Sequence, residues 1–311
     1  MKTGYKAVLG IAALAAVAVL GAALWEGQWG APALAITAAP DAKRGEYLIR
    51  AGGCIACHTE ERVLKDKGPV LGGGRALKTP FGTFHAPNIT KEPVHGIGKW
   101  SDADFVHAFR AGRAPSGHNY FPAFPYTSFA GADDSDLVDI KAYIFSLPAE
   151  AKPNKPHAVD FPYNIRFGLT FWKWMYFDRA RFRRDETKSA EWNRGAYLVN
   201  HLAHCGECHT PRDGLGGAKR AMAFAGAPDI EGGIAPNITP DEETGIGKWT
   251  DSNIVDVLKT GFMPDGNFVG GAMTDVVNHG TSLLTDEDLK AIAVYLKSVK
   301  PVRNKVEKKK Q

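Results

Sequence analysis

The sequence predicts a mostly helical protein with two tandem domains and an N-terminal membrane-spanning helix. One set of motifs occurs twice along the chain, and each copy contains helix-start signals and amphipathic runs. Strand-like alternation of apolar and polar residues is scarce. The 311 residues suffice for about two ordinary domains, and 44% hydrophobic residues allow each to bury a core.

The N-terminal stretch 7–25 contains no charged residue and follows Lys2 and Lys6. A spanning helix needs about 20 residues, whereas the apolar part of a secretory signal has about 7–15. We therefore expect a signal anchor over 1–28, a single span in the cytoplasmic membrane with the rest of the chain in the periplasm. A cleaved signal peptide is the alternative, because the sequence APALA at 31–35 offers small residues for processing.

The body of the chain consists of two copies of one unit, which we place at 40–151 and 191–303. The sequence RGEYLIRAGGCIACHT at 44–59 returns as RGAYLVNHLAHCGECHT at 194–210. The short sequences APNIT and GIGKW also occur in both copies, at a constant offset of 149 residues. Each copy is therefore expected to form its own small helical domain.

Helix signals recur at matching places in the two copies. A helix is expected after each GIGKW, ending at Gly112 in the first copy and at Gly261 in the second. Each copy then closes with an amphipathic helix, at 134–147 and at 286–299. Capping-box spacing is present at Ser101 with Asp104 and at Thr285 with Asp288.

Residues 152–190, between the copies, form an aromatic linker in which four arginines follow a cluster of aromatic residues. Such a segment could dock a partner or lie on a membrane surface. We favour a strap whose aromatic side chains pack across both domains while its arginines face water, because so apolar a segment is unfavourable when exposed. A basic tail follows at 304–311. The net charge of +4 is too small to indicate a nucleic-acid partner, and no basic stripe interleaved with aromatic residues appears.

All four cysteines belong to two Cys-x-x-Cys-His motifs. On a helix, positions i and i+3 share a face and i+4 lies beside them. Both thiols can then form thioethers with one haem while the histidine reaches its iron, so the motifs predict two covalently bound haem c groups. The motif residues are Cys54, Cys57 and His58 in the first copy and Cys205, Cys208 and His209 in the second.

Other uses of the cysteines fit less well. A single zinc site would have to join two pairs that lie about 150 residues apart in separate copies. A thioredoxin-like redox pair would sit in a βαβ pattern, which the sequence lacks. Structural disulfides would not require a histidine after each pair.

The second axial ligand decides what a haem iron does. In the second copy Met273 is the favoured ligand, because it lies in a Gly-rich loop before the last helix, 64 residues after His209. Met263 is the rival, but it aligns with Ala114 and directly precedes a proline.

The first copy has no methionine between residues 26 and 150, and Phe124 aligns with Met273. Haem 1 therefore cannot take a methionine from its own domain. We single out His118, six residues before Phe124, as the candidate ligand. The alternatives are another histidine, a methionine from elsewhere in the chain, or an open site. These candidates are His85, His95, His107, Met175 and Met222.

The chain resembles the membrane-bound multihaem cytochrome c subunits of bacterial periplasmic alcohol, aldehyde and sugar-acid dehydrogenases. The resemblance covers about 44–301. It is carried by both CxxCHT motifs, both APNIT…GIGKW segments, YFPAFPYTSF and GAMTDVVNHGTSLLTDEDLKAIAVYLKSV. It implies class I cytochrome c domains, proximal ligands His58 and His209, and Met273 as the distal ligand of haem 2. Many members carry three haems and read PAMPY where this chain has Phe124.

The resemblance implies an electron-transfer subunit rather than a catalyst. Electrons would come from a periplasmic dehydrogenase and pass to quinone, an oxidase or a soluble cytochrome. Without a methionine ligand, haem 1 should have the lower potential, so electrons should enter at haem 1 and leave at haem 2. The alternative is a haem enzyme, in which an open or weakly ligated haem 1 acts on peroxide, thiosulfate or nitric oxide.

Overall fold

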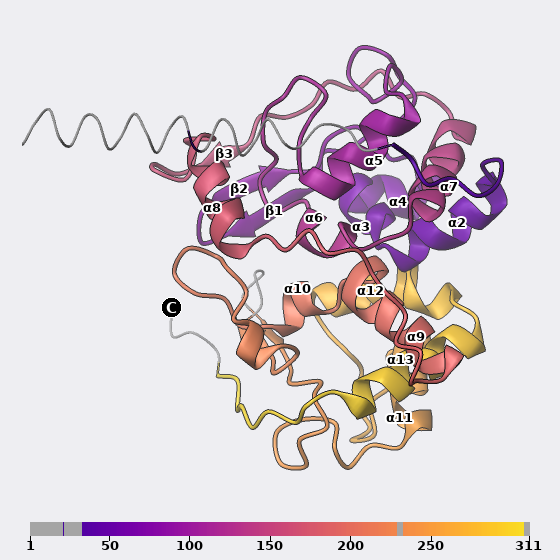
Figure 1. The fold of residues 1–311 in the computed structure, drawn as a ribbon, viewed down its shortest axis with the longest axis vertical. Helices are drawn as coiled ribbons and strands as arrows, with labels where there is room; N and C mark the ends of the chain where they lie inside the picture. The colour runs from indigo at the N-terminus through magenta and orange to yellow at the C-terminus, as the bar shows by residue number, and fades with distance from the viewer. Residues whose placement is uncertain (1–20, 22–32, 229–232, 308–311) are drawn as a thin grey trace, which may run out of the picture.

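The computed structural model describes Gly21 and residues 33–228 and 233–307 of the chain. The described elements are mostly helices, as predicted, and form two lobes that face each other (Figure 1). Elements α2 to α8 form the first lobe, and elements α9 to α13 form the second.

In the first lobe the helices cover the segments that carry the first cysteine motif. They are α2 (Ala42–Ala51), α3 (Cys54–His58), α4 (Glu61–Lys67), α5 (Asp102–Ala111), α6 (Tyr126–Phe129), α7 (Asp134–Ser146) and α8 (Gly168–Tyr176). Strands β1 (Ala76–Thr79), β2 (Gly82–His85) and β3 (Ala158–Val159) form a three-stranded antiparallel sheet with β2 in the middle.

The second lobe has the same order of principal helices. They are α9 (Ala190–Tyr197), α10 (Gly206–His209), α11 (Asp251–Thr260), α12 (Ala272–His279) and α13 (Asp286–Ser298). A π-helical turn at Leu198–Leu202 extends α9, and short 3₁₀ turns lie at Arg220–Met222 and Thr281–Leu283. Strands β4 (Ala227–Pro228) and β5 (Ile234–Ala235) pair antiparallel. Strands of two to four residues are too short to give an alternation pattern, so the sequence did not reveal them.

Each lobe contains a close crossing of two helices, α2 with α7 in the first lobe and α9 with α13 in the second. A Cβ atom added at Gly45 of α2 would lie 1.8 Å from the carbonyl oxygen of Asp139 in α7. A Cβ atom added at Gly195 of α9 would lie 1.9 Å from the carbonyl oxygen of Ala291 in α13. The repeated Arg-Gly sequence is thus explained, since only glycine allows the two backbones to approach this closely.

The predicted helix boundaries are confirmed where capping chemistry marks them. Ser101 and Asp104 form a capping box at the start of α5. Gly112 and Gly261 end α5 and α11 with φ angles of 58° and 77°, in the left-handed region that favours glycine. Local side-chain chemistry therefore fixes these ends in both lobes.

Matching hydrogen bonds join the two lobes in both directions. The hydroxyl of Tyr47 in α2 donates to Asp288 Oδ2 in α13 at 2.5 Å. The hydroxyl of Tyr197 in α9 donates to Asp136 Oδ2 in α7 at 2.6 Å. Tyr47 and Tyr197 occupy the same place in the repeated motif, so each lobe supplies one donor and one acceptor.

Each acceptor aspartate is also bound by an arginine of its own lobe. Arg44 pairs with Asp136, and Arg194 donates to both carboxylate oxygens of Asp288 at 2.7 and 2.6 Å. Burial alone would raise the pKa of Asp288, but hydrogen bonds from Arg194 and Tyr47 outweigh it and hold the pKa below its ordinary value. The carboxylate therefore stays ionised at the lobe interface.

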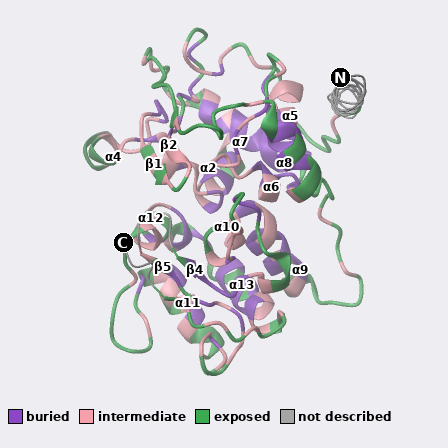
Figure 2. Ribbon diagram, turned by 90° about the vertical axis from the view of Figure 1, so that its left-hand side faces the viewer, coloured by how far each residue is buried: buried purple, intermediate pink, exposed green. Residues whose placement is uncertain are grey.

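The strap between the lobes packs inward on one side only. Trp172 and Phe177 are buried against the first lobe, and the Trp172 indole donates to the carbonyl oxygen of Leu215 in the second lobe at 2.9 Å. Trp174 and Met175, in contrast, are exposed, and Figure 2 shows exposed and buried segments side by side along α8. The expectation that the aromatic side chains pack across both lobes is therefore met only by the inner face of α8.

The predicted localisation, with a single N-terminal span, needs correction. None of the helices within Gly21, 33–228 and 233–307 has the length and apolar character needed to cross a membrane. The longest of them, α7 and α13, have 13 residues each, against about 20 for a span. Except for Gly21, the segment 7–25, which carried the prediction, lies outside the described residues. The prediction is therefore corrected: the described helices do not support a single N-terminal span.

Candidate haem sites

The first cysteine motif occupies the short helix α3. Gly53, with a φ angle of 63°, turns the chain from α2 into α3, so the motif starts on a new helical axis. Cys54, Cys57 and His58 then fall within one and a third turns. The second motif is arranged similarly, with Cys205 directly before α10 and both later residues inside it.

Both motif histidines make the same hydrogen bond. His58 Nδ1 lies 2.8 Å from the carbonyl oxygen of Pro87, and His209 Nδ1 lies 2.7 Å from that of Pro236. A carbonyl oxygen only accepts, so Nδ1 must carry the proton and Nε2 becomes the ligand nitrogen. These prolines belong to the repeated APNIT sequences, which therefore orient the histidines.

The threonine after each motif fixes the loop that follows. Leu71 N donates to Thr59 Oγ1, and Phe224 N donates to Thr210 Oγ1, both at 3.1 Å. Leu71 and Phe224 adopt positive φ angles of 59° and 62°, which are uncommon for such residues. The same strained turn therefore occurs in both lobes and is held by the same hydroxyl.

The motif residues fit a covalently attached haem better than they fit the alternatives. Burial lowers the pKa of His58, so its imidazole is neutral and can bind iron. Burial raises the pKa of the Cys54 and Cys205 thiols to about 12, whereas redox-active pairs have depressed values. No group of His, Cys, Asp and Glu in the described part of the chain is arranged to hold a metal ion by itself. These observations argue against a thioredoxin-like pair and a shared zinc site.

Met273, the predicted distal ligand of the second site, is the second residue of helix α12. Gly271, the residue before α12, has a φ angle of 59° and turns the chain into the helix. The Met273 side chain is half-buried and packs against the main core cluster. Its thioether is thus held on a helix rather than on a loose loop.

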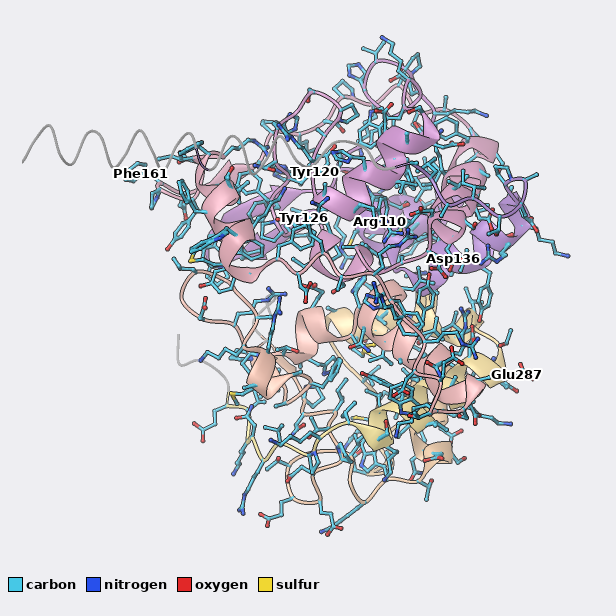
Figure 3. The ribbon with its side chains drawn as sticks, viewed as in Figure 1. Arg110, Tyr120, Tyr126, Asp136, Phe161 and Glu287 are labelled. Atoms are coloured by element: carbon cyan, nitrogen blue, oxygen red, sulfur yellow. The ribbon has the colours of Figure 1, made fainter. Side chains whose placement is uncertain are left out.

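In the first lobe the equivalent residue, Phe124, belongs to a layer of aromatic rings. Its ring lies 5.0 Å from Phe109, 5.7 Å from Tyr120 and 6.0 Å from Phe129, measured between centroids. Tyr126, which Figure 3 labels beside Tyr120, is fully buried two residues later. A packed aromatic layer therefore takes the place of the thioether.

His118 lies outside this layer. It is exposed, at a turn where Ala114 N donates to the His118 carbonyl oxygen, and its Nδ1 lies 2.8 Å from Ser116 Oγ. Its ring contacts Tyr120 at 5.7 Å, and Tyr120 in turn contacts Phe124. In this conformation Tyr120, rather than His118, adjoins the aromatic layer.

The other candidate ligands are scattered over the molecule. His107 in α5 and His85 at the end of β2 each have a buried Nδ1 without a hydrogen-bond partner among the described residues. Met175 is exposed on α8. These three side chains belong to three different elements, β2, α5 and α8.

The sequence did not reveal that both attachment helices line the lobe interface. Glu207, inside the second motif, accepts hydrogen bonds from Thr127 Oγ1 at 2.7 Å and Ser128 Oγ at 2.5 Å in α6 of the first lobe. Burial would raise the pKa of Glu207, but Arg212 and these hydroxyls outweigh it and lower the pKa. A charged carboxylate thus joins the second motif to the helix that follows Phe124.

The reverse contact joins the first motif to the second lobe. Arg75 donates to the carbonyl oxygen of Ala56, inside the first motif, at 2.9 Å and to Asp275 Oδ2 in α12 at 2.6 Å. Asp275 follows Met273 by two residues. The helix that carries the first motif, α3, is therefore linked to α12 of the second lobe, and α10 is linked to α6 of the first lobe. This arrangement fixes the two cysteine motifs relative to each other across one interface.

Comparison with known proteins agrees with this reading of the motifs. The cytochrome c family model matches residues 193–300. The diheme cytochrome c-type protein of Cereibacter sphaeroides is 44% identical over 83% of this chain and 86% of its own length. The fructose dehydrogenase cytochrome subunit of Gluconobacter japonicus is 39% identical over 84% of this chain, and so is the alcohol dehydrogenase (quinone) cytochrome c subunit of Gluconobacter oxydans. The match covers only 53% and 55% of those two longer subunits.

Proposed function

The chain belongs to the family of c-type cytochromes that includes dihaem cytochromes and the cytochrome c subunits of alcohol, fructose and gluconate dehydrogenases, and from this premise we propose that it carries electrons between two haem c groups. A dehydrogenase partner supplies the electrons, and quinone, an oxidase or a soluble cytochrome accepts them. When bound, each haem iron takes up and releases one electron.

The observation that carries this proposal is the matched pair of histidines. His58 and His209 are each oriented by a proline carbonyl oxygen, so both sites are prepared in the same way to hold a haem iron. Cys54 with Cys57, and Cys205 with Cys208, supply the thioethers. Reciprocal hydrogen bonds across the lobe interface hold the two lobes against each other.

We further propose that Met273 completes the second site and that the first site lacks a methionine. A methionine ligand raises the potential of a haem. Electrons then enter at the first site and leave at the second. We also propose His118 as the distal ligand of the first site. For His118 to reach the iron, the turn at 114–118 must move so that the imidazole ring passes Tyr120.

Attachment of two haems can be tested by intact-protein mass spectrometry of the full chain. We expect the mass of two covalently bound haems on the natural protein. The Cys54→Ser/Cys57→Ser variant should carry one haem, and the Cys205→Ser/Cys208→Ser variant should carry the other. A natural chain that carries a single haem would contradict the proposal.

A second candidate function follows from the aromatic layer around Phe124. If no side chain binds the first iron opposite His58, a small molecule can bind there, and the protein would be a haem enzyme. Carbon monoxide added to the reduced full chain separates the two functions. Binding of one molecule per chain supports the enzyme, and no binding supports the electron carrier.

A further inference from the structure

Helix α8 presents one face to the first lobe and a different face to solvent. On the inner face Leu169 and Trp172 are buried, and Lys173 Nζ donates to the carbonyl oxygens of Ala111 and Gly112 at 2.7 and 2.9 Å and to Asn119 Oδ1 at 2.5 Å. The inner face therefore fixes α8 on the segment that leads from α5 towards Phe124.

The outer face is an apolar stripe. Its helical members are spaced i, i+4, i+7 and i+8, so they lie on one side of α8. Trp174 is 71% exposed, and Phe161, in the loop before the helix, is 79% exposed and projects from the edge of the first lobe (Figure 3). The α8 outer face consists of Phe161, Ile165, Phe167, Phe171, Trp174 and Met175, all of which are exposed.

The α8 outer face is held in place although it is exposed. The Phe167 and Phe171 rings pack edge to face at 5.4 Å, and Arg166 donates to the carbonyl oxygen of Asn119 at 2.7 Å. Contiguous exposed apolar surface of this kind marks an interaction site in soluble proteins. A surface that is already ordered loses little conformational entropy when a partner binds.

Charge and residue types indicate the kind of partner. Residues 154–184 contain seven basic and two acidic side chains, a net +5, whereas the whole chain carries +4. The strap therefore holds the positive excess of the protein. Five of the seven basic residues in 154–184 are arginines. Trp, Phe, Met and Arg are enriched at protein interfaces, where Lys is depleted, so the composition favours a protein over a lipid surface.

The position of α8 indicates what the partner does. Through Lys173, Asn119 and Trp172 the helix packs on the lobe that carries the first motif, and Lys173 Nζ lies 5.0 Å from the Tyr126 ring centroid beside Phe124. A partner on this face adjoins the lobe of the first site, where electrons enter in the proposed function.

We propose that the α8 outer face is the docking surface for the electron-donating dehydrogenase subunit. This inference rests on the proposed function. The matching surface of the dehydrogenase has an apolar centre for Phe171 and Trp174 and a rim of carboxylates opposite the arginines of the strap.

The test compares two pairs of exposed aromatic side chains in the full haem-loaded chain. The Phe171→Ser/Trp174→Ser variant alters the proposed surface. The Phe262→Ser/Phe268→Ser variant alters an exposed aromatic pair of the second lobe, with ring centroids 5.3 Å apart, and serves as the matched control. Each protein is affinity-tagged in its own host, and the dehydrogenase that co-purifies with the natural chain is isolated. Reduction of the cytochrome is then followed with that dehydrogenase plus substrate, and separately with dithionite.

We expect the α8 variant to lose at least about ten-fold in the rate of substrate-driven reduction, since removal of central aromatic contacts costs this much at protein interfaces. Reduction by dithionite should not change, and the control variant should behave like the natural protein. Substrate-driven rates should also fall as salt is added, because the charges are screened.

The other outcomes are distinct from one another. If the dehydrogenase reduces the natural chain and the α8 variant equally fast, the docking surface is wrong and the proposed function stands. If no co-purifying dehydrogenase reduces the natural chain although dithionite does, both proposals fail. Two further results would overturn the proposal if substrate-driven reduction by the α8 variant is unchanged. Loss of a dimer in this variant would assign the face to a second copy of the chain. Loss of its binding to phosphatidylglycerol vesicles would assign the face to lipid.

Discussion

On the cysteine side of each site, the two lobes use the same contacts: a proline carbonyl for the histidine, a threonine hydroxyl for the following loop and a left-handed turn at the same place. At the positions of the predicted distal ligands they differ, with Phe124 in a packed aromatic layer and Met273 near the start of α12. The contacts around the cysteine motifs are thus shared, whereas the methionine proposed to tune the second haem has no counterpart in the first lobe. The following changes exchange or weaken these features, from the largest expected effect to the smallest.

Met273→Phe makes the second lobe like the first. We expect the potential of the second haem to fall and its low-spin signal in the EPR spectrum of the oxidised protein to change, because a thioether ligand raises the potential. Met263→Phe is the matched control and should leave both unchanged. If Met263→Phe produces the change and Met273→Phe does not, the ligand has been assigned to the wrong methionine.

Phe124→Met makes the first lobe like the second. We expect the first haem to gain a methionine signal in the EPR spectrum and its potential to rise towards that of the second haem. The gain should be smaller than the loss in Met273→Phe, because the Phe124 position lies within a packed layer of rings rather than at the start of a helix. An unchanged spectrum would show that position 124 does not face the iron.

Tyr197→Phe removes one of the two matched hydrogen bonds between the lobes. We expect the free energy of unfolding to fall by about 1.5–3 kcal/mol, as for other hydrogen bonds to charged groups. Tyr47→Phe should cost less, because the Asp288 side chain is 12% exposed and that of Asp136 is 4% exposed. Urea unfolding followed by circular dichroism gives both values. If neither substitution lowers the free energy of unfolding, these hydrogen bonds do not hold the lobes together.

The smallest effect concerns pH. The pKa of Asp288 is lowered in the folded protein, so its contribution to stability is complete above the ordinary aspartate pKa of about 3.9. That contribution is lost as the pH falls through the lower, folded value. The stability difference between the natural protein and Asp288→Asn should therefore shrink between about pH 5 and about pH 2. A difference that stays constant over this range would contradict the assignment of the charge to Asp288.

The sequence predicted those features that depend on residues close together in the chain. The helix caps at Ser101 and Gly112 were confirmed, because capping is decided within one turn. The motif histidines were identified by their spacing from the cysteines. Phe124 was identified because the second copy offers a direct comparison.

Contacts between the lobes could not be predicted in the same way. Tyr47 and Tyr197 occur at matching positions, and this pattern would look the same whether each hydroxyl bonded within its own lobe or across the interface. The outer face of α8 was also missed. Its periodicity shows that its side chains share a face, but the pattern does not tell whether that face is covered.

One measurement tests the difference between the two sites most directly, namely an EPR-monitored redox titration of the oxidised, haem-loaded full chain. We expect two separate one-electron steps, with the lower potential belonging to the first site and the higher potential to the site for which Met273 is proposed. Two steps at the same high potential, with methionine-type signals at both sites, would contradict it.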